Sequence, residues 1–273
     1  MRPPISKSFV ILLSLLLGSA VIASIQFRRT DHSTLRQPGD SIKEKLKQQY
    51  PIADSNETPP NDPKERAKRI KRSKKYNAKS PVIGPDLVQT SEGYNWPADF
   101  KPIPTSASNL IIVATTDTAA AHLSDDKNSV YSEFAVKIDQ VLKNETSLPI
   151  ICGESLTVVR KGGRVRYPSG HVSWFFVAGQ GLPQLNTQYI LFLKTTDEAK
   201  VFDIVTGYAI VNDRVEPLDY SPRVVGFQRY SGTSVTAFLS EVRNSILNAQ
   251  LDFSRLSRST TQRSVRECVS LSC

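Results

Sequence analysis

Residue types that bind metal ions are scarce in this chain of 273 residues, which has three cysteines and three histidines. A zinc site needs three or four protein ligands, and no histidine stands at a useful spacing from Cys268 and Cys273. The sequence therefore predicts no metal and no cofactor. In an oxidising compartment Cys268 and Cys273 can close a small loop. Cys152, beside the apolar run "LPII", is expected to be a small buried residue.

Signatures of common catalytic sites are also missing. The chain has neither a G-x-S-x-G nucleophile motif nor a G-x-x-x-x-G-K-[ST] phosphate-binding loop. Ser169 and His171 are close in sequence, but their adjacency in a turn does not direct the imidazole onto the hydroxyl. Asp125 and Asp126, near His122, have the composition of an exposed loop. We predict that the protein is not an enzyme; the alternative is an envelope hydrolase that uses His171 or the Asp125/Asp126 loop.

Long apolar runs are missing except near the start of the chain, where "FVILLSLLLGSAVIA" covers residues 9–23 after Arg2 and Lys7. Interpreted as a secretory signal peptide, this segment offers a small-residue exit for cleavage before Ser24. Interpreted as an uncleaved anchor, residues 8–27 would span roughly 30 Å at about 1.5 Å per residue. Both interpretations make residues 1–29 an export signal. The protein is therefore expected to be exported across the cytoplasmic membrane, either membrane-anchored or secreted.

Positive charge is distributed unevenly. Residues 1–80 contain 17 Lys and Arg against 7 Asp and Glu, whereas the whole chain has a net charge of +9. The remaining residues are therefore nearly neutral. Because a nucleic-acid-binding domain needs its basic footprint on the folded surface, and because the export signal leads away from chromosomal DNA, nucleic acid is not expected as a partner.

Residues 30–80 contain five prolines and hardly any large apolar side chain. Such a segment cannot bury enough surface to offset the entropy of ordering, so we expect a disordered basic linker. Its cluster "KERAKRIKRSKKY", residues 64–76, is either a solvated spacer or a contact with an anionic surface or cell-wall polymer. Residues 81–108 add three aromatic side chains and are expected to form an extended strap packed on the domain: Tyr94, Trp96 and Phe100.

From Asn109 the sequence takes on the pattern of a β domain. "NLIIVATT" is typical of a buried strand, and "DTAAAHLSDDKN" after it is expected to be a polar connection. Residues 130–142, "VYSEFAVKIDQVL", alternate between apolar and polar. This predicts a strand with one solvent-exposed face, made by Tyr131, Glu133, Lys137 and Asp139. Later runs raise the number to about seven short strands between residues 109 and 218, which is typical of a sandwich or small barrel.

The hydrophobic period changes after Pro222. Apolar residues then recur at intervals of three and four positions. This spacing predicts an amphipathic helix over about residues 235–249 that is capped by Thr233 or Ser234 and covers the barrel. A helix that binds a partner is the alternative. The β domain with its helix is expected over residues 109–250, and a flexible tail over residues 251–273.

The stretch "RKGGRVRYPSGHVSWFFVAGQGLP", residues 160–183, combines glycines, aromatic rings and basic side chains. Its Gly162–Gly163 pair predicts a tight hairpin turn and Pro168–Gly170 a second turn, which explains most of this composition. The side chains around these turns are candidate binding residues, although the two arginines could simply line the wet face of a hairpin: Arg164, Arg166, Tyr167, His171 and Trp174. We predict an exported, non-catalytic module that binds a protein or a cell-envelope polymer through them.

The order of "NLIIVATT", "VYSEFAVKIDQVLK" and "YILFLK" resembles that of the netrin-like and tissue-inhibitor-of-metalloproteinases group of OB-type barrels, and of secreted bacterial proteins with the same layout. The resemblance covers about residues 109–218. It implies a mainly β fold, a small antiparallel OB-like barrel with a five-stranded core whose loops bind a protein or a glycan. Inhibitors of that group chelate a protease metal through an amino-terminal cysteine. That mechanism is not expected here, because no cysteine precedes Cys152.

Overall fold

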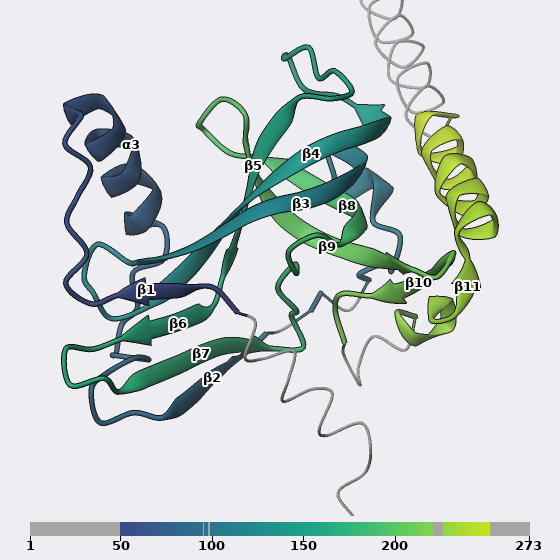
Figure 1. The fold of residues 1–273 in the computed structure, drawn as a ribbon. Helices are drawn as coiled ribbons and strands as arrows, with labels where there is room; N and C mark the ends of the chain where they lie inside the picture. Colours follow the sequence, from purple (N-terminus) through teal and green to yellow (C-terminus); the bar gives the residue numbers. More distant parts are fainter. Residues whose placement is uncertain (1–49, 95, 98, 221–225, 252–273) are drawn as a thin grey trace, which may run out of the picture. The chain divides into compact units, whose positions relative to one another are not determined.

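The computed structural model describes residues 50–251 except 95, 98 and 221–225 (Figure 1). The expected export signal, residues 30–49 of the expected linker and residues 252–273 of the expected tail lie outside the described residues. The described part is mainly β, with two sheets and a helix over residues 235–251. None of the helices in this part is long and apolar enough to cross a bilayer.

The larger sheet has seven strands in the order β11-β10-β9-β5-β4-β3-β8. Neighbouring strands are antiparallel except β5 and β9, which run parallel. Strand β9 also pairs with β8, so each of the five strands β3, β4, β5, β8 and β9 has at least two hydrogen-bonded neighbours. The bounds are β3 Leu110–Leu123, β4 Val130–Asn144, β5 Ser155–Lys161, β8 Gln188–Thr195, β9 Val201–Val211, β10 Arg214–Pro217 and β11 Thr233–Ser234.

Strand β4 follows the predicted alternation over only part of its length. Lys137 and Asp139 are exposed, as predicted for the wet face. Tyr131 is fully buried and Glu133 is half-buried, because Tyr76 and Arg72, from the segment before the β domain, cover this end of the strand. Strand β3 is also longer than predicted: it continues through most of the expected polar connection, pairing with β4 as far as Leu123.

The smaller sheet has the order β1-β6-β7-β2. Its bounds are β1 Ile52–Asp54, β2 Gln89–Gly93, β6 Gly163–Arg166 and β7 Val172–Ala178. The hairpin β6–β7 turns at residues 168–170, as predicted: the Tyr167 amide donates to the His171 carbonyl at 2.9 Å, and Gly170 has a φ of 81°. Strand β1 pairs with β6 and strand β2 with β7, both in parallel.

The predicted hairpin turn at Gly162–Gly163 is wrong. Strand β5 belongs to the larger sheet and β6 to the smaller one, so these glycines carry the chain from one sheet into the other. Both have positive φ, 119° and 146°. A Cβ on Gly163 would lie 3.0 Å from the Ser132 Oγ and 3.2 Å from a methyl group of Val130. The two glycines therefore allow the chain to cross from one sheet to the other in close contact with β4.

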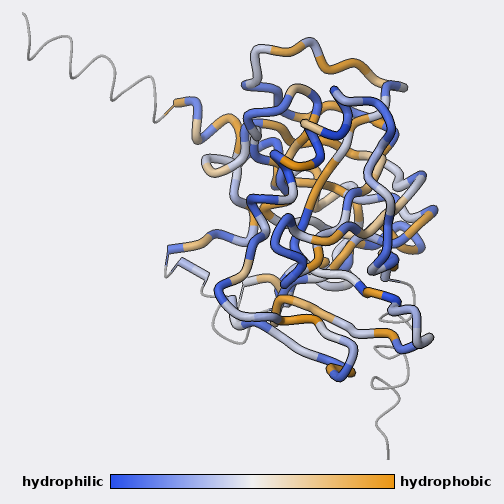
Figure 2. The backbone as a smooth tube through the Cα atoms, turned by 90° about the vertical axis from the view of Figure 1, so that its left-hand side faces the viewer, coloured by the Kyte–Doolittle hydropathy of each residue, from blue (hydrophilic) through white to orange (hydrophobic). Residues whose placement is uncertain are grey.

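The prediction of a disordered linker is wrong for residues 50–80. They contain β1 and the helix α3, Pro63–Lys74, whose first turn is capped by the Asp62 side chain accepting from the Lys64 amide at 2.9 Å. The prediction rested on the lack of large apolar side chains. This segment is held to the domain mostly by polar contacts instead, with Tyr76 and Ala53 buried. Helix α3 faces the viewer in Figure 2 and is mostly blue, or hydrophilic.

Three apolar clusters stabilise the fold. The first draws its side chains mainly from β3, β4, β5, β8 and β9. The second joins the other face of β3 and β8 to the C-terminal helix, where Phe238, Val242 and Ile246 are buried, so the predicted amphipathic helix is confirmed. Trp96 and Phe100, from the residues expected to form a strap, pack beside this second cluster. The third lies between the inner face of the smaller sheet and β3 and β4.

Candidate binding surface on the smaller sheet

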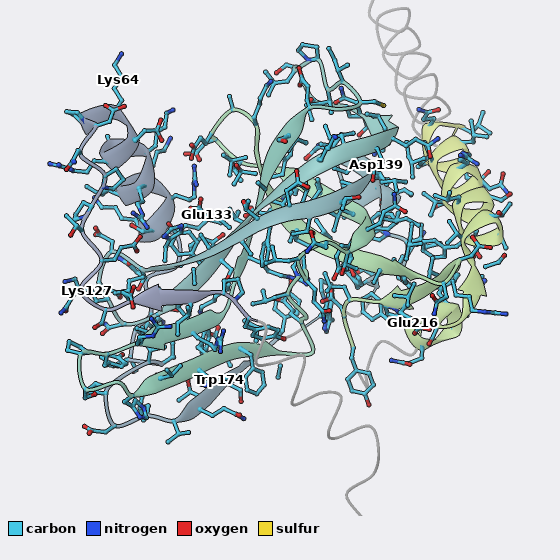
Figure 3. All side chains as sticks on the ribbon, viewed as in Figure 1. Lys64, Lys127, Glu133, Asp139, Trp174 and Glu216 are labelled. Atoms are coloured by element: carbon cyan, nitrogen blue, oxygen red, sulfur yellow. The ribbon has the colours of Figure 1, made fainter. Side chains whose placement is uncertain are left out.

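The five candidate binding residues all belong to the β6–β7 hairpin or its turn. Arg164 lies directly opposite Trp174, and Arg166 directly opposite Val172. Opposite residues of paired strands share a face, so these four side chains lie on one face of the sheet. The other face carries Val165 and other buried residues of the third cluster. Arg164, Arg166 and Trp174 therefore lie together on the outer face, and Figure 3 labels Trp174 on β7.

This outer face is open in the described structure. Arg164, Val172, Trp174 and Phe176 are partly exposed. The neighbouring edge strands add one apolar and three polar side chains to the same face: Ile52 and Asp54 from β1, Gln89 and Ser91 from β2. From here on, the outer face means the face of the β1-β6-β7-β2 sheet that points away from the third cluster.

Arg164 and Trp174 form a cation–π pair. The guanidinium carbon lies 5.3 Å from the indole ring centroid, and Arg164 Nε donates to the Tyr50 carbonyl at 2.7 Å. These two contacts restrain the guanidinium on this face of the sheet.

Arg166 adds a second positive charge beside the first. Burial and, second, the neighbouring Arg166 charge lower the pKa of Arg164. Arg166 is itself well exposed, and its nearest carboxylate, Asp54, is 3.8 Å away. Such a long contact between exposed groups is weak. The two guanidiniums therefore repel each other with little compensation from this face.

Tyr167 and His171 do not join the outer face. Tyr167 packs against the third cluster on the inner side, and burial raises its pKa. His171 Nε2 donates to the Leu87 carbonyl at 2.9 Å, which ties the turn to the chain entering β2. Ser169 Oγ only accepts a long bond of 3.4 Å from the His171 backbone amide. The imidazole is thus not directed at the neighbouring hydroxyl.

The aspartates of the alternative catalytic loop shape a turn. Burial raises the pKa of Asp126, but hydrogen bonds from the Ser124 hydroxyl and from the amides of Asn128 and Ala78 outweigh it and lower the pKa. Asp125 is exposed. His122, near the end of β3, lies 3.4 Å from Glu57, and among the described residues no hydrogen bond joins it to either aspartate.

Sequence reasoning missed one group of charged residues, around α3. Arg72 bridges Glu133 on β4 and Glu198 in the turn after β8, with both N–O distances at 2.5 Å (Figure 3 labels Glu133). The sequence did carry a signal for this helix: Asp62 followed by Pro63 is a helix start. The described residues contain no group of His, Cys, Asp and Glu suited to hold a metal ion. Cys152, expected to be buried, is exposed.

Comparisons with known proteins identify no relatives: no family model, curated protein or solved structure matches this chain significantly.

Proposed function

We propose that this protein is an exported, non-catalytic binding module whose outer face binds an anionic polymer of the cell envelope. The observation that carries the proposal is the pair of adjacent guanidiniums, Arg164 and Arg166, beside the ring of Trp174 on an open sheet face.

The physical reason is the weakly compensated positive charge of Arg164 and Arg166. An anion bound between Arg164 and Arg166 would relieve their mutual repulsion, and guanidinium groups bind carboxylates and phosphates with two parallel hydrogen bonds. Trp174 provides a flat, amphipathic surface for a ring-shaped repeating unit. A charged polymer with rings fits this combination, because its acidic groups can bind the guanidiniums while its rings pack on Trp174.

The alternative of an envelope hydrolase has less support. His171 donates from Nε2 to the Leu87 carbonyl, which holds the ring in the turn, and the Ser169 hydroxyl is contacted at 3.4 Å by the His171 backbone amide rather than by the ring. Asp126 is engaged with the backbone and side chains of its own turn. We therefore propose binding without catalysis.

We also propose that β3, β4, β5, β8 and β9 form an OB-type barrel of the netrin-like kind. Its support is the pairing around these five strands, β3-β4-β5-β9-β8 and back to β3, with one parallel contact between β5 and β9. We further propose that residues 1–29 direct export, either as a cleaved signal peptide or as a membrane anchor.

Polygalacturonate, an anionic polysaccharide, is a suitable probe, with uncharged dextran as its reference. Calorimetry on the full-length chain is expected to show that R164Q,R166Q weakens binding roughly tenfold or more. The control K137Q,K194Q removes the same charge from exposed lysines on other strands and should bind as the wild type does. Equal losses in both variants would contradict a role for the outer face. If wild-type protein does not bind the polysaccharide, the proposal of a polymer ligand is contradicted and a protein partner is favoured.

A further inference from the structure

Helix α3 is strongly basic and lies against acidic side chains of the larger sheet. Its sequence, PKERAKRIKRSK, has seven Lys and Arg and one Glu. We call the facing carboxylates the acidic surface: Glu133 on β4, Asp197 and Glu198 in the turn between β8 and β9, and Asp203 on β9.

Ion pairs make most of the contact between α3 and this surface. Besides the two bonds of Arg72, Lys71 lies 2.6 Å from Asp197, and Lys75, just after the helix, pairs with Asp203. Burial alone would lower the pKa of Arg72, but its bonds to Glu198 and Glu133 raise it. Arg72 therefore binds two defined carboxylates of the acidic surface, and this makes the contact between the helix and the surface specific.

Apolar contacts contribute little along α3. Its buried residue is Ser73, whereas Ile70 is 42% exposed. None of the three apolar clusters contains a residue of the helix. An aromatic contact lies just after the helix in sequence: the Tyr76 ring stacks on the Tyr131 ring, with centroids 4.5 Å apart and an interplanar angle of 11°. The cores of the domain are thus complete without α3.

The contact is also accessible from outside. A cavity of about 480 Å³ lies between the last turn of α3 and the turn after β8, lined by Lys71, Lys74 and Lys75 on one side and by Asp197 and Asp203 on the other. The pairs of Lys71 with Asp197 and of Lys75 with Asp203 are open to solvent beside it, and such exposed ion pairs are weak.

We propose that α3 of a second copy of this chain binds the acidic surface in place of the resident helix. Every copy carries the helix that already fits the surface, so exchange needs no new complementarity. The proposal is independent of the outer face and of its ligand. Within one chain the tethered helix has a high effective concentration, so exchange becomes visible when the resident helix is disabled.

Two full-length variants test the exchange. R69E,R72E removes the bonds of Arg72 to Glu133 and Glu198 and the bond of Arg69 to Glu57, and keeps the acidic surface. E133K,E198K reverses the charge of the two carboxylates that bind Arg72 and keeps the helix. Each variant alone is expected to be monomeric by light scattering, and a mixture is expected to form a 1:1 complex. The control K64E,K68E changes the exposed side of the same helix and should behave as the wild type.

A labelled peptide of residues 57–79 gives a second readout. It should bind R69E,R72E at least about tenfold more tightly than wild type, because the competing helix is gone, and should not bind E133K,E198K. A mixture that stays monomeric with no peptide binding would overturn the proposal. So would loss of the folded state in R69E,R72E, monitored by circular dichroism, since α3 would then be part of the fold rather than an exchangeable segment.

Discussion

Arg160 and Asp219 form a bidentate ion pair in the interior, with both N–O distances at 2.7 Å and both side chains almost fully buried. Arg160 also donates to the carbonyls of Gly181 and Val205, and Asp219 accepts from the Gly181 amide. One guanidinium therefore joins β5 to β9, to the loop after β7 and to the segment after β10.

Replacing Asp219 with Asn should destabilise the fold strongly, because it leaves the Arg160 charge buried and unpaired. We expect a loss of about 3–5 kcal/mol in the free energy of unfolding, measured with urea. Asp54→Asn is the matched control, since its partner Arg166 is exposed and 3.8 Å away. A similar small effect of both substitutions would contradict the assigned role of the buried pair.

The fold should lose stability in acid partly through Glu57. Burial raises the pKa of Glu57, but hydrogen bonds and charge from His122 and Arg69 outweigh it and lower the pKa below its ordinary value of 4.5. A carboxyl with a lowered folded-state pKa stabilises above the unfolded value, and this contribution is lost as the pH falls through the folded value. Melting temperatures between about pH 5.5 and pH 3 should therefore fall less steeply in Glu57→Gln than in wild type. Identical slopes would count against this assignment.

Gly163→Ala should be more damaging than Gly170→Ala. Both glycines have positive φ, so alanine is strained at either position. At Gly163 the new methyl also meets Ser132 Oγ at 3.0 Å, whereas at Gly170 it meets nothing within 4 Å. We expect Gly163→Ala to cost about 1–3 kcal/mol more than Gly170→Ala in urea unfolding. Equal costs would indicate that β4 can move away from the crossing.

Adjacent residues of β7 should respond in opposite ways to truncation. Phe175 is fully buried in the third cluster, so Phe175→Ala should cost about 3–5 kcal/mol of unfolding free energy. Trp174→Ala should cost far less, because that ring lies on the outer face, yet it should weaken polygalacturonate binding. Thermal unfolding and calorimetry on both variants check this. A Trp174→Ala protein that is as unstable as Phe175→Ala would place the indole in the core.

The parts of the fold with regular side-chain periods were predictable from sequence. The alternation around Phe134 and Val136 identified β4, and the three-and-four spacing around Phe238 and Val242 identified the C-terminal helix. These patterns report which face is buried, and so they carry structural information directly.

The contacts of residues 50–80 were not predictable in the same way. Hydrophobicity measures apolar burial, whereas α3 lies on the domain through charged side chains such as Arg72, whose partners are distant in sequence. The same contact hides Tyr131 and Glu133 on the face of β4 that the pattern assigned to solvent. For the candidate binding residues, composition pointed to the stretch that forms the β6–β7 hairpin. Strand register then separated Arg164, Arg166 and Trp174 from Tyr167 and His171.

Backbone hydrogen exchange on the full-length chain, with and without polygalacturonate, tests the proposed binding face most directly. Bound polymer is expected to slow exchange in β6 and β7, with little change around α3 and in the C-terminal helix. Slowed exchange confined to those helices, or no change anywhere in the described residues, would contradict the assignment of the outer face as the binding surface.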